Sequence, residues 1–373
     1  MTTEPSLGRR MPAEWERHEA TWIAWPHHEP DWPGKLAPIP WVYAEIVRAL
    51  GEYERVEILC HDASVAETAR TLLGSHSVNE RSYRVHIVSN DTVWLRDSAP
   101  TGVIRPTGEV ELLNWGFNGW AKYPNYRKDA EIGCEIERIT GLARIVPRRP
   151  DNGERLILEG GGIEVNGSGR IMVTEEWLLS DVQVRNPGMV AGDYEQAFDE
   201  YLGATDTIWL GEGAVGDDTH GHIDDIARFS SADTVILAYE QDGNDENYAR
   251  SADNMRRLEA AARKKPLRIV TIPFPRPVMM NGERLPASYA NFYVANGVVL
   301  VPTFNDPNDR IALNGIAEAF PGRTVIGIHA VDLVWGLGTL HCLTQQQPAS
   351  SGAGAGASTP PTRRGETGGD KRG

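Results

Sequence analysis

Apolar and polar residues alternate in four segments of the chain, and each segment is long enough for two strands. The segments span residues 99–113, 161–173, 223–238 and 289–302. Thr107-Gly108 divides the first, and Asn-Gly pairs at 166–167 and 296–297 divide the second and the fourth. Asn-Gly between alternating apolar residues favours a tight turn between two antiparallel strands. We therefore predict four β-hairpins.

A different periodicity fills the sequence between these hairpins. Apolar residues recur there with the 3.6-residue spacing of an amphipathic helix. The predicted helices span residues 42–53, 65–73, 194–202, 247–263 and 309–319. Hairpin, helix and strand follow one another every 50–70 residues, which indicates an α/β protein built from repeated modules.

Composition limits how much of the chain takes part in this fold. The sequence has 373 residues, 40% of them hydrophobic and 24% charged, which is typical of a globular protein. We expect a single domain over residues 1–347. Residues 348–373 are mostly Gly, Ala, Ser, Thr, Pro and charged residues, so we predict a disordered tail.

Charge and cysteine content exclude several classes of protein. A net charge of −15 argues against a nucleic-acid partner, because phosphates would be repelled. No apolar run is long enough to span a membrane, and the first ten residues lack the apolar stretch of a signal peptide. Cys60, Cys134 and Cys342 are widely spaced and form no Cys-x-x-Cys motif. We expect a cytoplasmic protein without membrane association.

Reactive polar residues stand just before three of the hairpins and near the end of the chain. Asp97, Glu159 and His222 follow one another at intervals of 62 and 63 positions, and Cys342 comes last. If the modules are arranged around an axis, equivalent points in successive modules converge at one end. The spacing therefore predicts one central site.

Cys342 on its own is a weak candidate. It follows two glycines, Gly336 and Gly338, which allow a tight turn or the close approach of a ligand. A free cysteine is nevertheless more often a small buried apolar residue than a nucleophile. Cys60 lies in an apolar strand and Cys134 has no polar cluster around it, so we interpret both as structural.

The segment 216–225 is dense in functional side chains and leaves two interpretations open. His220, His222 and Asp224 alternate along the chain and fit a metal site. Alternatively, His222 is a general acid and base, and Asp224 presents a carboxylate to the same pocket. A metal would need further ligands, and no second His-rich or Cys-rich cluster supplies them. A solvated acidic loop is the simplest competing interpretation.

Two other carboxylates stand in unusual surroundings. Asp97 follows Trp94 and Arg96 within one short turn, where Arg96 and Asp97 also fit a structural ion pair. Glu159 ends an apolar run and precedes three glycines. That context suggests a buried group that a ligand or the backbone approaches closely, with structural capping as the alternative.

Taken together, these motifs resemble the agmatine deiminase family, which is close to bacterial peptidylarginine deiminases. The resemblance covers residues from about 11 to 347, and the motifs occur in family order. The matching segments are 11–16, 21–26, 94–97, 158–161, 219–225, 288–293 and 340–346.

The resemblance implies a fold and a role for each candidate residue. Members of this family have the pentein fold, an α/β propeller of five ββαβ-type modules around a pseudo-fivefold axis. By motif, Cys342 corresponds to the nucleophile and His222 to the general acid and base. Asp97 and Asp224 correspond to the carboxylates that bind the guanidinium group. Glu159 corresponds to the carboxylate that orients the histidine.

The resemblance also implies a reaction. An agmatine deiminase hydrolyses agmatine to N-carbamoylputrescine and ammonia through a covalent thiouronium intermediate, as a step toward putrescine and other polyamines. The partner is then a small cationic guanidinium compound, and no metal or organic cofactor is needed. The alternatives are a peptidylarginine or free-arginine deiminase, a metal-dependent hydrolase using His220, His222 and Asp224, and a non-catalytic binding protein. A homo-oligomer is compatible with the sequence.

Two positions bear on the substrate. Family members often carry three glycines before the segment that leads to the cysteine, whereas Leu337 replaces the middle one here. This substitution concerns the conformation of the loop and the range of substrates. Among the tryptophans Trp22, Trp25, Trp94 and Trp115, we expect only Trp94 to contact the substrate, because it stands beside Arg96 and Asp97.

Overall fold

All four predicted hairpins are present in the computed structural model, which describes residues 8–350. The antiparallel pairs are β4 (Thr101–Ile104) with β5 (Val110–Leu113), β7 (Glu164–Val165) with β8 (Arg170–Thr174), β10 (Ala227–Ser231) with β11 (Thr234–Ala238), and β15 (Tyr293–Ala295) with β16 (Val298–Thr303). Gly108, Gly167 and Gly297 turn the chain with positive φ angles of 87°, 69° and 80°, which glycine adopts without steric cost.

Each hairpin gains a third strand that runs parallel to its second strand. These third strands are β6 (Ala143–Ile145), β9 (Asp206–Leu210), β12 (Arg268–Ile272) and β17 (Thr324–His329). A parallel connection requires a crossover segment, which is why helices separate the strands in the sequence. The result is a series of small mixed sheets, and the predicted α/β class is confirmed.

A fifth mixed sheet joins the two ends of the described chain. Its strand order is β18-β1-β2-β3, with β18 (Gln345–Pro348) antiparallel to β1 (His18–Ala24). Strands β2 (Arg55–Cys60) and β3 (Tyr83–Ile87) continue the sheet in parallel. A separate two-stranded hairpin consists of β13 (Met279–Met280) and β14 (Glu283–Arg284).

The predicted helices are present with shifted ends. They correspond to α1 (Ile39–Leu50), α2 (Ala63–Ser75), α6 (Ala191–Ala197), α7 (Glu246–Lys264) and α8 (Asn308–Ala319). Helix α1 begins three residues before the prediction and ends at Leu50, because Gly51 and the turn after it break the helix. Helix α6 ends early and continues as a π turn, Phe198–Leu202. The pattern missed α4 (Ile132–Thr140) and the short α5 (Glu175–Leu179).

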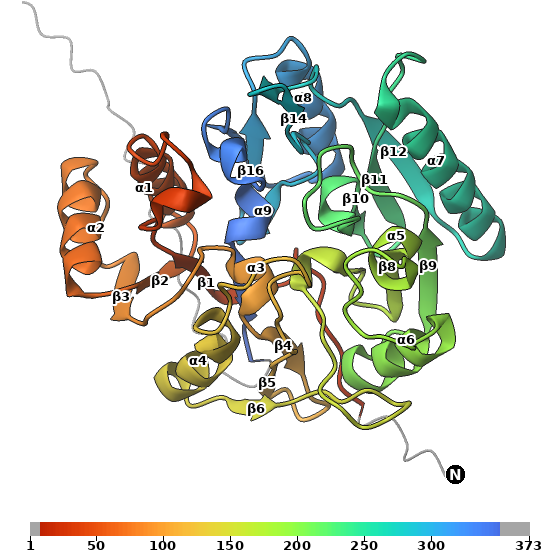
Figure 1. Ribbon diagram of the computed structural model, residues 1–373, viewed down its shortest axis with the longest axis horizontal. Helices are drawn as coiled ribbons and strands as arrows, with labels where there is room; N and C mark the ends of the chain where they lie inside the picture. Colours follow the sequence, from red (N-terminus) through yellow and green to blue (C-terminus); the bar gives the residue numbers. More distant parts are fainter. Residues whose placement is uncertain (1–7, 351–373) are drawn as a thin grey trace, which may run out of the picture.

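Short helices occupy the middle of the molecule. In Figure 1, α3 (Leu95–Ser98) and α9 (Leu340–Leu343) lie near the centre, while α2, α4, α6, α7 and α8 lie around the outside. Two hydrophobic clusters fill the space between the sheets and their helices.

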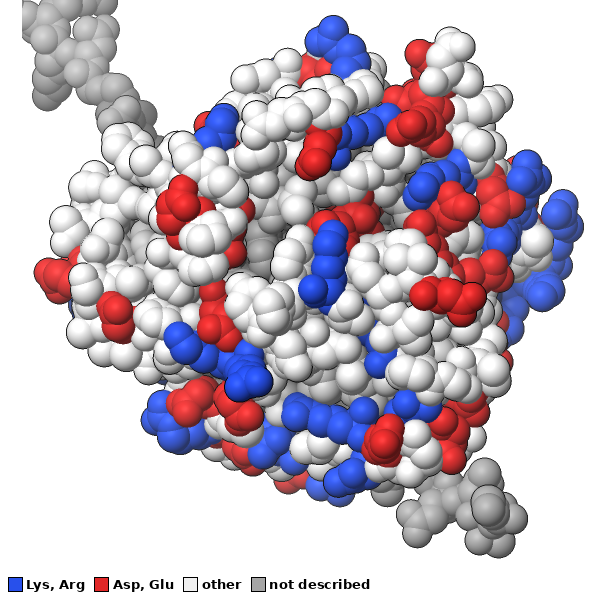
Figure 2. All heavy atoms as spheres, viewed as in Figure 1, with Lys and Arg blue, Asp and Glu red and all other residues white. Residues whose placement is uncertain are grey.

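Figure 2 shows the distribution of charged side chains on one face of the molecule. Acidic and basic side chains are interspersed around the face shown in Figure 2. Within residues 8–350, no helix combines the length and the apolar character that crossing a lipid bilayer requires. The predicted tail, residues 348–373, falls outside the described residues from 351 onward, so its disorder stays a prediction.

Candidate active site

Four short helical segments each precede an edge strand of a different sheet, and they meet. These segments are α3, η3 (Gly160–Gly162), η5 (Ile223–Asp225) and α9, which precede β4, β7, β10 and β18. Segment α3 packs against both η3 and α9, and η3 packs against η5. The structure therefore brings together all five residues that the sequence singled out, each of them buried: Asp97, Glu159, His222, Asp224 and Cys342.

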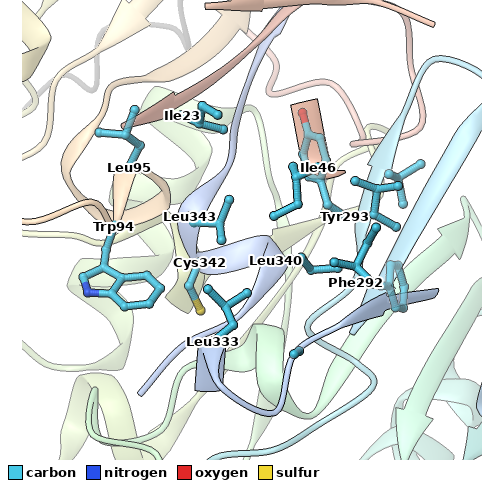
Figure 3. Packing of buried hydrophobic residues seen from close by; sticks show 14 of the residues in the cluster. Ile23, Ile46, Trp94, Leu95, Phe292, Tyr293, Leu333, Leu340, Cys342 and Leu343 are labelled. Carbon is cyan, nitrogen blue, oxygen red and sulfur yellow. The ribbon is translucent and has the colours of Figure 1, made fainter. Parts of the chain in front are cut away.

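Cys342 lies on α9 with its sulfur directed into this centre. Figure 3 shows Trp94 and Leu333 near the sulfur, whereas Leu340 and Leu343 point toward other apolar side chains. The sulfur is 3.7 Å from Asp224 Oδ2, which accepts the thiol proton, and 3.1 Å from Asn291 Nδ2. Burial and the charges of Asp224, Asp225 and Asp97 raise the pKa of the Cys342 thiol well above its usual value.

His222 is surrounded by carboxylates. Its Nδ1 is 3.9 Å from Asp97 Oδ1 and its Nε2 is 3.6 Å from Glu159 Oε2. Neither ring nitrogen has a hydrogen-bond partner among the described residues. Burial alone would lower the pKa of His222, but Asp97, Glu159 and Asp224 raise it to about 9. The imidazole is therefore protonated at neutral pH and free to donate to another group.

Asp97 is held by two donors that fix the plane of its carboxylate. The Gly161 backbone N–H donates to Oδ1 at 3.0 Å, and Trp120 Nε1 donates to Oδ2 at 2.8 Å. Burial raises the pKa of Asp97, His222 lowers it, and the carboxylates of Asp224 and Glu159 bring it to about 6. Asp97 is thus charged at neutral pH, and each of its oxygens is held at a defined position.

The two carboxylate oxygens of Asp224 have different surroundings. Its Oδ2 lies 2.7 Å from His341 Nδ1, while its buried Oδ1 has no partner among the described residues. Burial would raise the pKa of Asp224, but the hydrogen bond and charge of His341 lower it. Glu14 holds the other ring nitrogen of His341, with 2.7 Å between Nε2 and Oε2. Both ring nitrogens of His341 therefore face a carboxylate, Asp224 on one side and Glu14 on the other.

Two hydrogen-bond donors fix the orientation of the Glu159 carboxylate. Arg185 Nε donates to Oε1 at 3.1 Å, and Trp177 Nε1 donates to Oε2 at 2.8 Å. Burial raises the pKa of Glu159, but the charges of Arg185 and His222 lower it to about 2. The Trp177 ring also packs edge-on against the His222 imidazole, with 5.5 Å between ring centroids. Trp177 therefore contacts both the carboxylate and the histidine of this pair.

Gly161 allows these groups to approach one another. A Cβ atom there would lie 2.6 Å from His222 Nδ1, 2.9 Å from Asp97 Oδ1 and 3.0 Å from Asp224 Oδ2. These distances are too short for any side chain. The middle of the three glycines after Glu159 is therefore the point around which the polar groups gather.

One cavity opens onto this centre. Its volume is about 220 Å³, and Asp31, Trp94, Asp97, Trp120, Asp218, Leu337 and Cys342 are among the lining residues. Trp94 lies in it as expected, with its ring 5.6 Å from that of Trp32. Trp22, Trp25 and Trp115 are core residues elsewhere. Leu337 keeps the backbone conformation of a glycine, with φ at 67°, and places its side chain at the cavity.

His220, one of the three predicted metal ligands, does not lie in the centre. His220 Nε2 pairs with Ser180 Oγ at 3.0 Å, and the side chain lines a separate surface depression with Glu176. Within the described part of the chain, no group of three or more His, Cys, Asp or Glu side chains is arranged to hold a metal ion. His220 and His222 therefore belong to different surroundings, although only one residue separates them.

Sequence reasoning missed several residues that build the centre. Glu14, Asn291 and His341 lie within the motifs that carried the resemblance, but nothing in their spacing assigned them a role. From the sequence alone, Trp120 and Trp177 are apolar residues. In the structure their indole N–H groups donate to Asp97 and Glu159. The motif at residues 11–16 was the one available signal for Glu14.

Fold and site together define a class: an α/β protein with a buried centre of one thiol, two imidazoles and several carboxylates. Residues 10–348 match the Porphyromonas-type peptidyl-arginine deiminase family. The chain is 34% identical to an agmatine deiminase of Pseudomonas aeruginosa (strain LESB58), over 93% of this chain and 98% of that protein. An agmatine deiminase of Ectopseudomonas mendocina is 33% identical over 95% and 99% of the two chains.

Solved structures give the same result. The agmatine deiminase of Enterococcus faecalis superimposes with a TM-score of 0.83 at 28% identity, covering 91% of this chain and 96% of that one. A C. jejuni agmatine deiminase variant with substrate bound gives a TM-score of 0.81 at 26% identity, over 92% and 97% of the two chains. The chain therefore belongs to the Porphyromonas-type peptidyl-arginine deiminase family.

Proposed function

We propose that this protein is an agmatine deiminase that hydrolyses agmatine to N-carbamoylputrescine and ammonia. The observation that carries the proposal is one buried centre in which Asp224 lies next to the sulfur of Cys342 and His222 lies next to Asp97. The names of its curated relatives and structural neighbours support the same reaction. We also propose that the small mixed sheets are the five modules of a pentein propeller, that residues 1–347 form one domain, and that the enzyme is cytoplasmic.

The carboxylates suit the first step, which is binding of the planar guanidinium cation. A guanidinium group stays protonated at biological pH and donates several N–H bonds in one plane. Asp97 and Asp224 would accept these bonds, and Asp224 Oδ1 is buried without a protein partner. Charge-assisted bonds of this kind would fix the central carbon in front of the sulfur.

Covalent chemistry follows from the position of Cys342. The thiolate attacks the guanidinium carbon and forms a tetrahedral adduct. Protonated His222 donates a proton to one nitrogen, ammonia leaves, and an S-alkylthiouronium remains on Cys342. Neutral His222 then accepts a proton from water, whose oxygen adds to the same carbon. Breakage of the C–S bond then returns the electron pair to sulfur, the remaining hydroxyl proton passes to the released ammonia or to solvent, and the ureido product leaves.

Substrate charge is part of this scheme. Carboxylates around Cys342 hold the thiol in its protonated form in the free enzyme. A bound guanidinium brings a positive charge next to the sulfur, which favours the thiolate. Activation of the nucleophile is therefore coupled to binding, and the thiolate of Cys342 is less populated in the free protein than in the complex.

The cavity favours agmatine over arginine. Its described lining includes the carboxylates of Asp31, Asp97 and Asp218, and no lysine or arginine. Agmatine carries a second cation on its chain, whereas the α-carboxylate of arginine would face Asp31 and Asp97; Lys122 pairs with the third carboxylate, Asp218. Like charges placed together cost several kcal/mol, so we expect at least about 100-fold discrimination in kcat/KM.

The test is release of ureido product from agmatine, free arginine and an arginine-containing peptide. Agmatine should react fastest, and Cys342→Ala should abolish product while leaving the fold intact. Folded protein that releases no ureido product from any of the three would refute the deiminase proposal. Activity that survives Cys342→Ala but disappears with a chelator would instead establish the metal-dependent alternative.

A further inference from the structure

The segment 288–293 belongs to the motifs that carried the family resemblance, but none of its side chains has a role in the scheme above. Ser288 and Asn291 are its buried polar members, and Asn291 has 1% of its surface exposed. It lies just before β15, the first strand of a sheet, at the point where Asp97, Glu159, His222 and Cys342 precede the other four sheets. The sheet of β15, β16 and β17 thus also contributes a side chain to the centre, from the segment that precedes its edge strand.

The contacts of Asn291 fix which end of its amide faces Cys342. Its Oδ1 accepts from the His341 backbone N–H at 3.1 Å and from Thr339 Oγ1 at 2.7 Å. A backbone N–H only donates, so the oxygen must be at that end. The Nδ2 group therefore faces the other way, 3.0 Å from Asp225 Oδ1 and 3.1 Å from Cys342 Sγ.

The sulfur has few sources of stabilisation in the free protein. Three aspartates surround it, and Asp224 accepts its proton. Among the described side chains, Asn291 is the one that donates a hydrogen bond to Sγ. A donor on a charged atom is worth more than one on a neutral atom, so this bond favours the thiolate over the thiol.

We propose that Asn291 is a catalytic hydrogen-bond donor that stabilises the negative sulfur of Cys342. It acts on the thiolate before attack on the guanidinium carbon. It acts again when the C–S bond of the thiouronium breaks and the sulfur leaves with the electron pair. Asp225 holds the second amide hydrogen, so the donor cannot turn away from the sulfur. The second role rests on the proposed deiminase function, whereas the first does not.

The test uses the free protein and no guanidinium substrate. Alkylation of Cys342 by iodoacetamide is followed by peptide mass spectrometry as a function of pH, which separates Cys342 from Cys60 and Cys134. Asn291→Ala should slow alkylation about ten-fold at pH 8 and move the pH profile to higher pH. Asn291→Asp keeps the shape, removes the donor and should give at least as large a shift.

Asn254 supplies a matched control. Asn254 is equally buried. Its amide accepts a hydrogen bond from the Gly211 N–H and donates one to the Glu212 carbonyl, and it makes no hydrogen bond to Cys342. Asn254→Ala should lower stability without moving the alkylation profile. Unchanged profiles in both Asn291 variants, with the fold intact by circular dichroism, would overturn the proposal. Absence of ureido product from agmatine, arginine and the arginine peptide in the unmodified protein would overturn the deiminase function and leave this result standing.

Discussion

At the scale of single residues, the pKa values in the centre depend on how closely its charged side chains approach one another. Cys342, His222 and the aspartates are ordinary side chains whose properties come from one another. The pKa of His222 lies near 9 because carboxylates surround it, and the pKa of Asp97 lies near 6 because it is buried among like charges. These two values bound the pH range of the proposed reaction.

The first prediction concerns that pH range. Asp97 must be charged to bind a guanidinium, so kcat/KM should rise as the pH increases through about 6. His222 must be protonated to release ammonia, so kcat/KM should fall as the pH increases through about 9. The guanidinium group does not titrate in this range, which assigns both limbs to the protein. Steady-state rates from pH 5 to 10 measure the profile, and a flat profile would contradict both assignments.

Gly161 provides a second test at the same scale. A methyl group there collides with His222, Asp97 and Asp224, so Gly161→Ala should lower kcat by at least about 100-fold. Gly192→Ala is the control, because nothing lies within 4 Å of a Cβ at that position. Full activity in Gly161→Ala would show that the groups do not act from the positions observed.

At the scale of elements, the loop before α9 combines strain and specificity. Leu337 occupies a left-handed conformation that costs a non-glycine residue roughly 1–2 kcal/mol. Its side chain lines the cavity beside Trp94 and packs against the core. The substitution thus leaves the backbone in the conformation that glycine favours and adds an apolar wall to the cavity.

Comparison of Leu337→Gly with Leu337→Ala separates these two effects. Both remove the apolar wall, so both should raise the KM for agmatine by up to about ten-fold with kcat nearly unchanged. Only glycine relieves the strain, so Leu337→Gly should be more stable than Leu337→Ala by about 1 kcal/mol. Thermal unfolding and steady-state kinetics supply both numbers. Equal stability of the two variants would argue against strain at this position.

At the scale of the whole molecule, a buried ion network connects distant parts of the chain. Glu14 lies near the N-terminus, and its Oε2 contacts Arg228 at 3.0 Å and His341 at 2.7 Å. Arg228 also binds Glu164 at 2.8 Å, and all four side chains are buried. The network thereby joins segments next to β1, β7, β10 and β18, and one of its members holds Asp224.

Removal of Glu14 should therefore destabilise the entire fold. Glu14→Ala leaves the buried arginines Arg228 and Arg96 with one carboxylate fewer, which typically costs about 3–5 kcal/mol, so the free energy of unfolding should fall by about that amount. Glu45→Ala is the control, because Glu45 pairs with Arg48 on the surface and should matter by less than about 0.5 kcal/mol. Denaturant titration measures both, and equal effects would mean that the network adds nothing.

The sequence by itself determined the elements and the main reactive groups. Hairpins at 99–113 and 289–302 could be predicted because Gly108 and Gly297 mark turns that depend on local backbone freedom. Asp97, Glu159, His222 and Cys342 could be singled out because they recur at similar distances before the strands. Helix α4 was missed although its nine residues are amphipathic, because Gly133 in its first turn disfavours a helix.

Only the tertiary structure decided which polar groups touch. Glu14, Asn291 and His341 are separated from their partners by up to hundreds of residues, and their roles come from contacts made through space. His220 and His222 show the converse, because two neighbours in the sequence point into different surroundings. Local periodicity determines which way a strand or helix faces, whereas contacts between the ends of different modules determine the pKa values and the chemistry. Those contacts exist only when the whole chain has folded.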